Sequence, residues 1–118
     1  SELSSQRYDL LSDTEMEKLL SALENLVDSL GNAAYEVEYH SGVLTLRLGD
    51  KGTYVINKQP PNKQIWLSSP FSGPKRYDYH AEDKTWVYSR DGQSLPDLLN
   101  KELSEVLDQA VDVAELAD

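Results

Sequence analysis

The sequence contains no cysteine. This absence excludes disulfides, thiolate nucleophiles and thiolate metal sites such as zinc fingers or iron–sulfur ligation. Histidine is scarce as well, since His40 and His80 are the two in the chain and stand far apart. They are too few for a histidine-rich metal centre, and we expect both to be solvent-exposed loop residues. The motifs of metalloproteases, P-loop enzymes, serine hydrolases and dinucleotide-binding proteins are also missing, so no conventional hydrolase or transferase is indicated.

Long apolar runs are missing too. No stretch approaches the roughly 18 residues that a membrane-spanning helix needs. The opening SELSSQRYDL lacks the charged start and apolar block of a secretory signal, so we expect any targeting segment to have been removed. A chain of 118 residues is long enough to bury a hydrophobic core that is stable without disulfide bonds or structural metal ions. We therefore expect one domain spanning residues 1–118.

The net charge is −10, and it is unevenly distributed. Residues 1–38 carry nine acids and two bases, residues 39–95 carry five acids and eight bases, and residues 96–118 carry seven acids and one base. The acidic ends would repel a phosphate backbone, so no nucleic-acid partner is expected. The same like-charged ends favour a monomer, and they suit a basic protein partner or a cation.

Helical periodicity marks both ends of the chain. Between residues 8 and 30, leucines recur on one face of a helix, and Gly31 follows as a stop signal. Near the other end, Ser94 is a suitable N-cap for a helix with Pro96 in its first turn. The tail 111–118 alternates weakly and is expected to lie along the helices.

The middle of the chain reads as consecutive short strands. Alternation of apolar and polar residues, with glycine and proline turns between the runs, predicts strands at 35–39, 43–48, 53–57, 64–69, 76–79 and 85–89. Such short connections exclude a parallel sheet. The sequence therefore predicts an α+β fold, a two-layer α-β sandwich with two helices packed on one face of a five- to six-stranded antiparallel sheet. The other face is left in water.

Acidic residues follow one side of the first predicted helix. Within an arc of about 100°, next to the leucine face, lie Asp9, Asp13, Glu17, Glu24 and Asp28, which we call the acidic ridge. Glu36 and Glu38 on the first predicted strand would extend it. The ridge is either a solvated helix face or a site that attracts hard cations, which carboxylates suit. A cation held there would be bound weakly at an exposed surface.

A second group of candidates surrounds the prolines at 60 and 61. Trp66 has the opposite parity to Ile65 and Leu67, so if those two face the helices, Trp66 faces water. Trp86 is then the candidate for the buried tryptophan. An outward tryptophan beside amides and cations is typical of a partner interface, although a hairpin could share this composition. The candidate partner-binding residues are Asn57, Lys58, Gln59, Asn62, Lys63, Gln64, Trp66, Lys75 and Arg76.

At these residues the sequence resembles the frataxin family in its mature eukaryotic form. The similarity covers nearly the whole chain and is carried by the runs 52–59, 61–70, 72–78 and 86–89. The resemblance implies a protein of the mitochondrial matrix that serves iron–sulfur cluster assembly. It implies docking on the complex of cysteine desulfurase and its scaffold protein, with acceleration of sulfur transfer. The same α-β sandwich is expected from it.

The resemblance also implies iron as a ligand. Fe²⁺ would be bound weakly by carboxylates of the first helix and first strand. The residues that match the family's partner-binding sheet positions are Asn57, Lys58, Gln59, Gln64, Trp66 and Arg76. We therefore interpret the protein as a non-enzymatic activator of its partner complex. The alternative interpretation is an iron chaperone or ferroxidase that delivers or oxidises Fe²⁺. The sequence departs from the family at two positions that bear on iron binding. Arg90 and Pro96 replace histidines that some members carry, so iron cannot be ligated by histidine at either position. The loop 79–84 is also longer than usual, so His80 has no clear counterpart.

Overall fold

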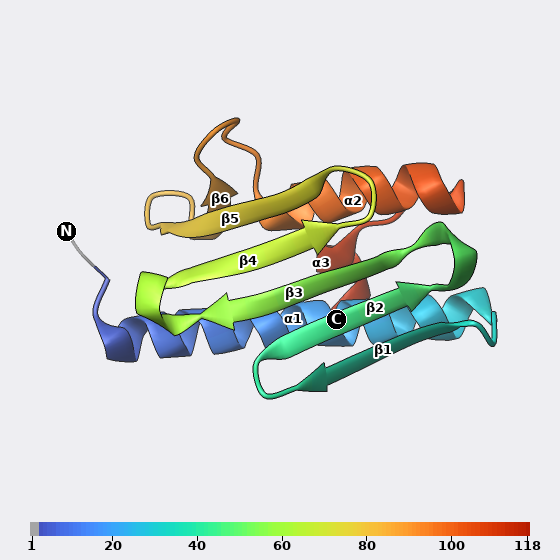
Figure 1. The fold of residues 1–118 in the computed structure, drawn as a ribbon, viewed down its shortest axis with the longest axis horizontal. Coiled ribbons are helices and arrows are strands. Elements are labelled where there is room, and N and C mark those ends of the chain that lie inside the picture. The colour runs from blue at the N-terminus through green and yellow to red at the C-terminus, as the bar shows by residue number, and fades with distance from the viewer. Residues whose placement is uncertain (1–2) are drawn as a thin grey trace.

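Six antiparallel strands form one sheet in the computed structural model, which describes residues 3–118 (Figure 1). Their order in the sheet follows their order in the chain. The strands are β1 (Tyr35–His40), β2 (Val43–Leu48), β3 (Thr53–Gln59), β4 (Gln64–Ser69), β5 (Gly73–His80) and β6 (Thr85–Tyr88). Each strand pairs with the next through a tight connection, because short turns permit only antiparallel neighbours. The predicted antiparallel sheet is confirmed.

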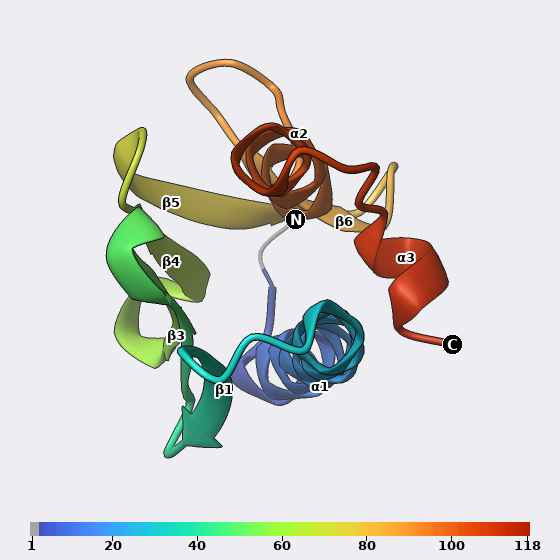
Figure 2. The ribbon, with the colours of Figure 1, turned by 90° about the vertical axis from the view of Figure 1, so that its right-hand side faces the viewer.

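In the described part of the chain, two long helices cover one face of this sheet and leave the other uncovered (Figure 2). The first, α1 (Ser5–Leu30), begins where the Ser4 hydroxyl accepts a hydrogen bond from the Arg7 amide, and it ends at Gly31 with φ of 63°. The second, α2 (Leu95–Leu107), is capped by Ser94, whose hydroxyl accepts from the Asp97 amide. None of the helices in residues 3–118 combines the length and apolarity needed to cross a membrane.

A third helix, α3 (Val113–Leu116), was not predicted. It is one turn long, too short to show helical periodicity in sequence, and it starts where the Asp112 carboxylate accepts from the Ala114 amide. Its backbone is tied to α1 through Asn25, whose side-chain amide donates to the Leu116 carbonyl at 2.6 Å. Because α3 lies on the helical side of the sheet, the opposite face stays uncovered (Figure 2).

The core lies between the helices and the inward side of the strands. Alternate strand residues are buried there, among them Leu44, Leu46, Ile56, Ile65 and Trp86. Trp86 is 1% exposed and meets the Tyr8 ring edge-on at a centroid distance of 6.0 Å. Burial of each such side chain contributes roughly 1.5–3 kcal/mol. The expectation that Trp86 is the buried tryptophan is confirmed.

Several strand ends differ from the predicted ones. β3 continues to Gln59, because the break comes only where Pro60 starts a 3₁₀ turn, η2 (Pro60–Asn62). β5 starts at Gly73 rather than Arg76, since β4 and β5 form a hairpin that pairs up to Gly73. β6 ends at Tyr88, whose carbonyl accepts from the Gly92 amide and so turns the chain away from the sheet.

A half-buried carboxylate, that of Glu102, joins α2 to the turn between β4 and β5. The Glu102 carboxylate accepts hydrogen bonds from the hydroxyls of Tyr54 at 2.7 Å, Ser69 at 2.7 Å and Ser72 at 2.6 Å. Burial of Glu102 raises its pKa, but the three hydroxyl donors and the nearby Lys75 outweigh burial, and the pKa lies below the ordinary value of 4.5. The network therefore holds the β4–β5 turn more strongly when Glu102 is ionised than when it is protonated.

This arrangement predicts a pH-dependent contribution to stability. A carboxylate with a lowered pKa in the folded state stabilises it above pH 4.5, and the stabilisation is lost as the pH falls through the folded-state pKa. We expect Glu102→Gln to lower the free energy of unfolding by about 1 kcal/mol at pH 7, with the deficit shrinking below about pH 4. Urea titrations at both pH values measure it, with the exposed Glu105→Gln as the matched control. A deficit that does not change with pH would contradict this role.

Candidate functional site

Polar and aromatic side chains line the uncovered face of the sheet, which we call the open face. On its central row, Asn57 of β3 lies opposite Trp66 of β4, and Trp66 lies opposite Arg76 of β5. The Arg76 guanidinium is 4.5 Å from the centroid of the Trp66 ring, a cation–π contact. Trp66 is half-buried by these neighbours and points away from the helices. Its predicted outward orientation is confirmed.

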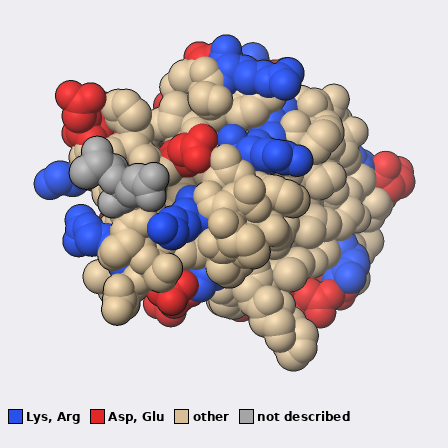
Figure 3. Space-filling model, turned by 60° about the vertical axis from the view of Figure 1, so that its left-hand side comes forward, with Lys and Arg blue, Asp and Glu red and all other residues tan. Residues whose placement is uncertain are grey.

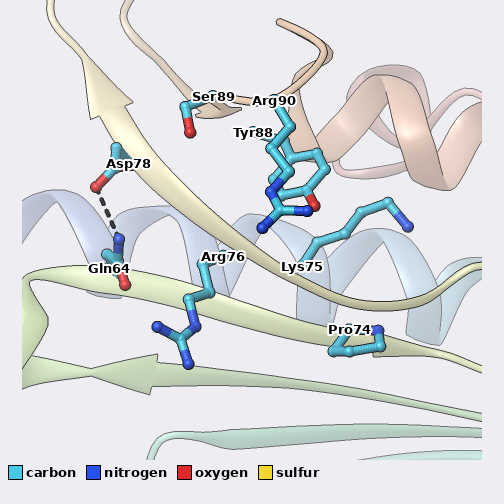
Figure 4. Close-up of a pocket in the computed structure, with 8 residues that line it drawn as sticks. All are labelled: Gln64, Pro74, Lys75, Arg76, Asp78, Tyr88, Ser89 and Arg90. Carbon is cyan, nitrogen blue, oxygen red and sulfur yellow. Dashed lines mark hydrogen bonds between the residues drawn. The ribbon is translucent and has the colours of Figure 1, made fainter.

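Hydrogen bonds fix the amides beside Trp66. The indole N–H donates to the Gln64 amide oxygen at 2.8 Å, and the Gln64 amide nitrogen donates to Asp78 at 3.0 Å (Figure 4). The Asn57 side chain donates to the Lys58 carbonyl at 3.1 Å and to the Gln59 amide oxygen at 3.4 Å. These side chains are therefore ordered before any partner arrives, which lowers the entropic cost of binding.

A tyrosine under the sheet anchors the ends of β3 and β4. The Tyr8 hydroxyl donates to the Gln64 carbonyl at 2.8 Å and accepts from the Gln59 amide at 3.0 Å. Burial raises the pKa of Tyr8 above its ordinary value. The two polar strand ends are thus tied to α1 and positioned by it.

Lys58 and Lys75 stand apart from the other candidates. Both occupy inward parities, since Lys58 pairs with Ile65 and Lys75 with Leu67. The Lys58 ammonium therefore reaches the acidic ridge, 2.7 Å from Asp13 and 3.8 Å from Asp9.

The Lys75 ammonium instead bonds to the Ser72 hydroxyl at 2.6 Å, at the margin of the sheet. Asn62 and Lys63 lie on the η2 turn and just after it, at one end of the sheet. The structure thus brings together on the open face Asn57, Gln59, Gln64, Trp66 and Arg76.

The acidic ridge is exposed along α1, as its place on the helix predicts. Lys58 neutralises its first turns, because it lies between Asp9 and Asp13. Tyr39 borders the same region, and its pKa is raised by burial and further by the Asp13 carboxylate. Farther along α1, Glu24 and Asp28 border a separate surface hollow. The ridge is therefore divided into a partly neutralised segment and a free one.

Glu36 and Glu38 do not extend the ridge. They lie on the side of β1 opposite α1, since the residues of β1 that contact the core are Tyr35, Val37 and Tyr39. Both glutamates pair instead with Arg47 of β2, whose guanidinium is 2.9 Å from the Glu36 carboxylate. The reason is the strand alternation, which sends the two glutamates to the open face.

No enclosed metal site is present in the part of the chain that the structure describes. Residues 3–118 contain no group of three histidine or carboxylate side chains placed to hold one ion. A cation on the ridge would take one or two carboxylate oxygens and complete its coordination with water. Both histidines are exposed, but each ends a strand rather than standing in a loop, and His80 lies 3.0 Å from Asp83.

A cavity at the margin of the open face was not predicted. It has a volume of about 540 Å³ and lies between β5 and the segment that follows β6 (Figure 4). Arg76, Asp78 and Arg90 line it, together with Tyr88. Sequence patterns could not reveal it, because its two walls come together only through the β5–β6 pairing.

The chain is similar to known mitochondrial proteins over most of its length. It is 42% identical to the frataxin homolog of Schizosaccharomyces pombe over 98% of this chain and 73% of that protein. It is 53% identical to the mitochondrial frataxin of Dictyostelium discoideum over 78% of this chain and 48% of that protein. Because these relatives are mitochondrial, the expected mitochondrial localisation is confirmed.

The solved structures agree with the fold. A crystal structure of trimeric yeast frataxin complexed with ferrous iron matches with a TM-score of 0.75 and 43% identity, over 84% of this chain and 87% of that one. That protein is a trimer, and the expectation of a monomer for this chain stays a prediction. The family model described as a frataxin-like domain matches residues 1–109. The α-β sandwich, the sequence identity and this match together show that the chain belongs to the frataxin family.

Proposed function

We propose that this chain is an accessory protein of iron–sulfur cluster assembly in the mitochondrial matrix. It docks its open face on the complex of cysteine desulfurase and scaffold protein and accelerates persulfide sulfur transfer to the scaffold. The observation that carries the proposal is the ordered row of Asn57, Trp66 and Arg76 on a sheet face that none of the helices in residues 3–118 covers. The partner is the one that the resemblance to the frataxin family implies.

The chemistry of the open face suits binding rather than catalysis. Tryptophan and arginine are the residues that most often dominate interface energetics. The strand residues that form the face, Asn57, Gln59, Gln64, Trp66 and Arg76, include no serine, threonine or histidine, and the chain has no cysteine to carry sulfur itself. Such a protein raises a partner's rate by binding one of its conformations better than the others, which shifts the population toward that conformation.

Substitutions on the central row test the docking face. We expect Trp66→Ala and Arg76→Ala each to weaken binding to the desulfurase–scaffold complex by about 1–3 kcal/mol, because each removes half of the stacked pair. Stability should change little, since both side chains lie outside the core. Affinity and sulfur-transfer rates measure the effect.

The matched control is Phe71→Ala, which truncates an aromatic residue that is 51% exposed and stands in the β4–β5 turn away from the central row. It should retain wild-type binding. Wild-type affinity and full stimulation in both Trp66→Ala and Arg76→Ala would exclude docking through the open face.

A second candidate function is handling of ferrous iron as cargo, as an iron chaperone or ferroxidase. The acidic ridge favours it, because carboxylate oxygens bind Fe²⁺ and bind Fe³⁺ more strongly. The related yeast frataxin has been crystallised with ferrous iron. Asp9, Asp13 and Glu17 on α1, and Glu24 and Asp28 farther along it, are the residues proposed to hold the ion.

Lys58 provides a test of the ridge, because its ammonium competes with a cation for Asp9 and Asp13. We expect Lys58→Gln to strengthen Fe²⁺ binding by severalfold, up to about fivefold, and Asp13→Asn to weaken it. Anaerobic Fe²⁺ titration followed by NMR line broadening measures both, with the exposed Asp50→Asn as the control. If broadening occurs outside residues 9–28, or Lys58→Gln leaves affinity unchanged, the ridge is a solvated helix face.

A further inference from the structure

Among residues 3–118, half of β5 has no strand paired with it on one of its sides. β5 pairs with β4 from Gly73 to Tyr77, whereas β6 pairs with β5 only from Tyr77 to His80. The segment 73–76 therefore has a free edge, where backbone N–H and C=O groups are available to an added strand. Pro74 removes one donor from this edge, and the remaining groups still accept and donate. The cavity of about 540 Å³ lies beside this free edge.

The walls of the cavity are positively charged in a strongly acidic protein. Arg76 and Arg90 line it with Lys75 (Figure 4), whereas the whole chain has a net charge of −10. Within residues 3–118, neither arginine forms an ion pair with a carboxylate. Asp78 is the acidic residue in the wall, and one of its oxygens is already held by the Gln64 amide. Figure 3 shows one face of the molecule, on which Lys and Arg side chains lie at the top and centre and also at the left.

We propose that this cavity binds an acidic, extended segment of the partner protein. The segment adds as a short strand to the free edge of β5 at residues 73–76 and places a carboxylate between the guanidiniums of Arg76 and Arg90. Strand addition supplies affinity through backbone hydrogen bonds, and the two arginines select the acidic side chain. The inference rests on the proposed docking function, and it adds the chemistry of the partner segment and a role for Arg90.

A protein segment fits the site better than a nucleic acid does. The chain has a net charge of −10, which repels a long phosphate backbone. A short carboxylate-bearing strand places its charge only where the arginines are. The free strand edge also favours a peptide, since a peptide has the backbone N–H and C=O groups that pair with a strand and a nucleic acid does not.

The test uses two six-residue peptides, each acetylated and amidated at its ends: Thr-Glu-Val-Asp-Thr-Glu and its neutral match Thr-Gln-Val-Asn-Thr-Gln. Backbone amide NMR of the full chain should show the acidic peptide shifting signals of residues 73–76 and 88–90, with the neutral peptide binding more weakly. Arg90→Gln should reduce affinity for the acidic peptide about fivefold and leave the neutral peptide unaffected. Lys51→Gln, which removes an exposed charge on the turn after β2, is the matched control and should bind as wild type.

Three results would overturn the proposal: equal binding of the two peptides, no binding of either, or stronger shifts of the same amides by a short oligonucleotide. The sulfur-transfer assay separates this failure from failure of the proposed function. If the wild-type protein accelerates transfer while the peptide results are negative, docking stands and the acidic-strand site is wrong. If the peptide binds as expected but transfer is not accelerated, the site stands and the desulfurase–scaffold assignment is wrong.

Discussion

The burial of one side of the sheet against α1 and α2 determines the direction of every strand side chain. Because strand residues alternate, placing Ile65 and Leu67 in the core sends Trp66 to the opposite face, and pairing across strands then sets Asn57 and Arg76 beside it. The same constraint sends Lys58 toward α1 and Glu36 and Glu38 away from it. A slip of one residue in register would exchange the two faces and bury the polar row. The same alternation of residues therefore fixes both the hydrophobic core and the open face.

The fold was predictable from sequence because the apolar periodicities are strong and the turns are marked by glycine and proline. The orientation of a residue within a single strand, such as Trp66 in β4, was predictable from the alternation of side chains along that strand. Lys58 shows why others did not: it sits among amides in sequence, but its parity belongs to the inward side of β3, where Asp13 reaches it across the layers at 2.7 Å. Arg90 shows a second limit, since its approach to Arg76 at one cavity depends on where β6 ends, a boundary set by local hydrogen bonds at Tyr88.

The charges of the molecule are arranged as two separate surfaces. The acidic ridge follows α1, and the cationic margin follows β5 and the segment after β6, with the sheet between them. A partner that is basic in one region and acidic in another would be oriented by both, because complementary charge acts mainly on the rate and orientation of encounter. Lys58 of β3 lowers the negative potential at Asp9 and Asp13, beneath the strand that presents Asn57.

The central claim is that Trp66 is the tryptophan that a partner covers, whereas Trp86 stays in the core. Incorporation of 5-fluorotryptophan gives two fluorine NMR signals, one for each tryptophan. On exchange from H₂O to D₂O, the Trp66 signal should shift and the Trp86 signal should not, because the first ring is half-exposed and the second is buried. Addition of unlabelled desulfurase–scaffold complex should remove the solvent sensitivity of Trp66. A Trp66 signal that is insensitive to solvent in the free protein, or that keeps its full sensitivity in the complex, would contradict the account.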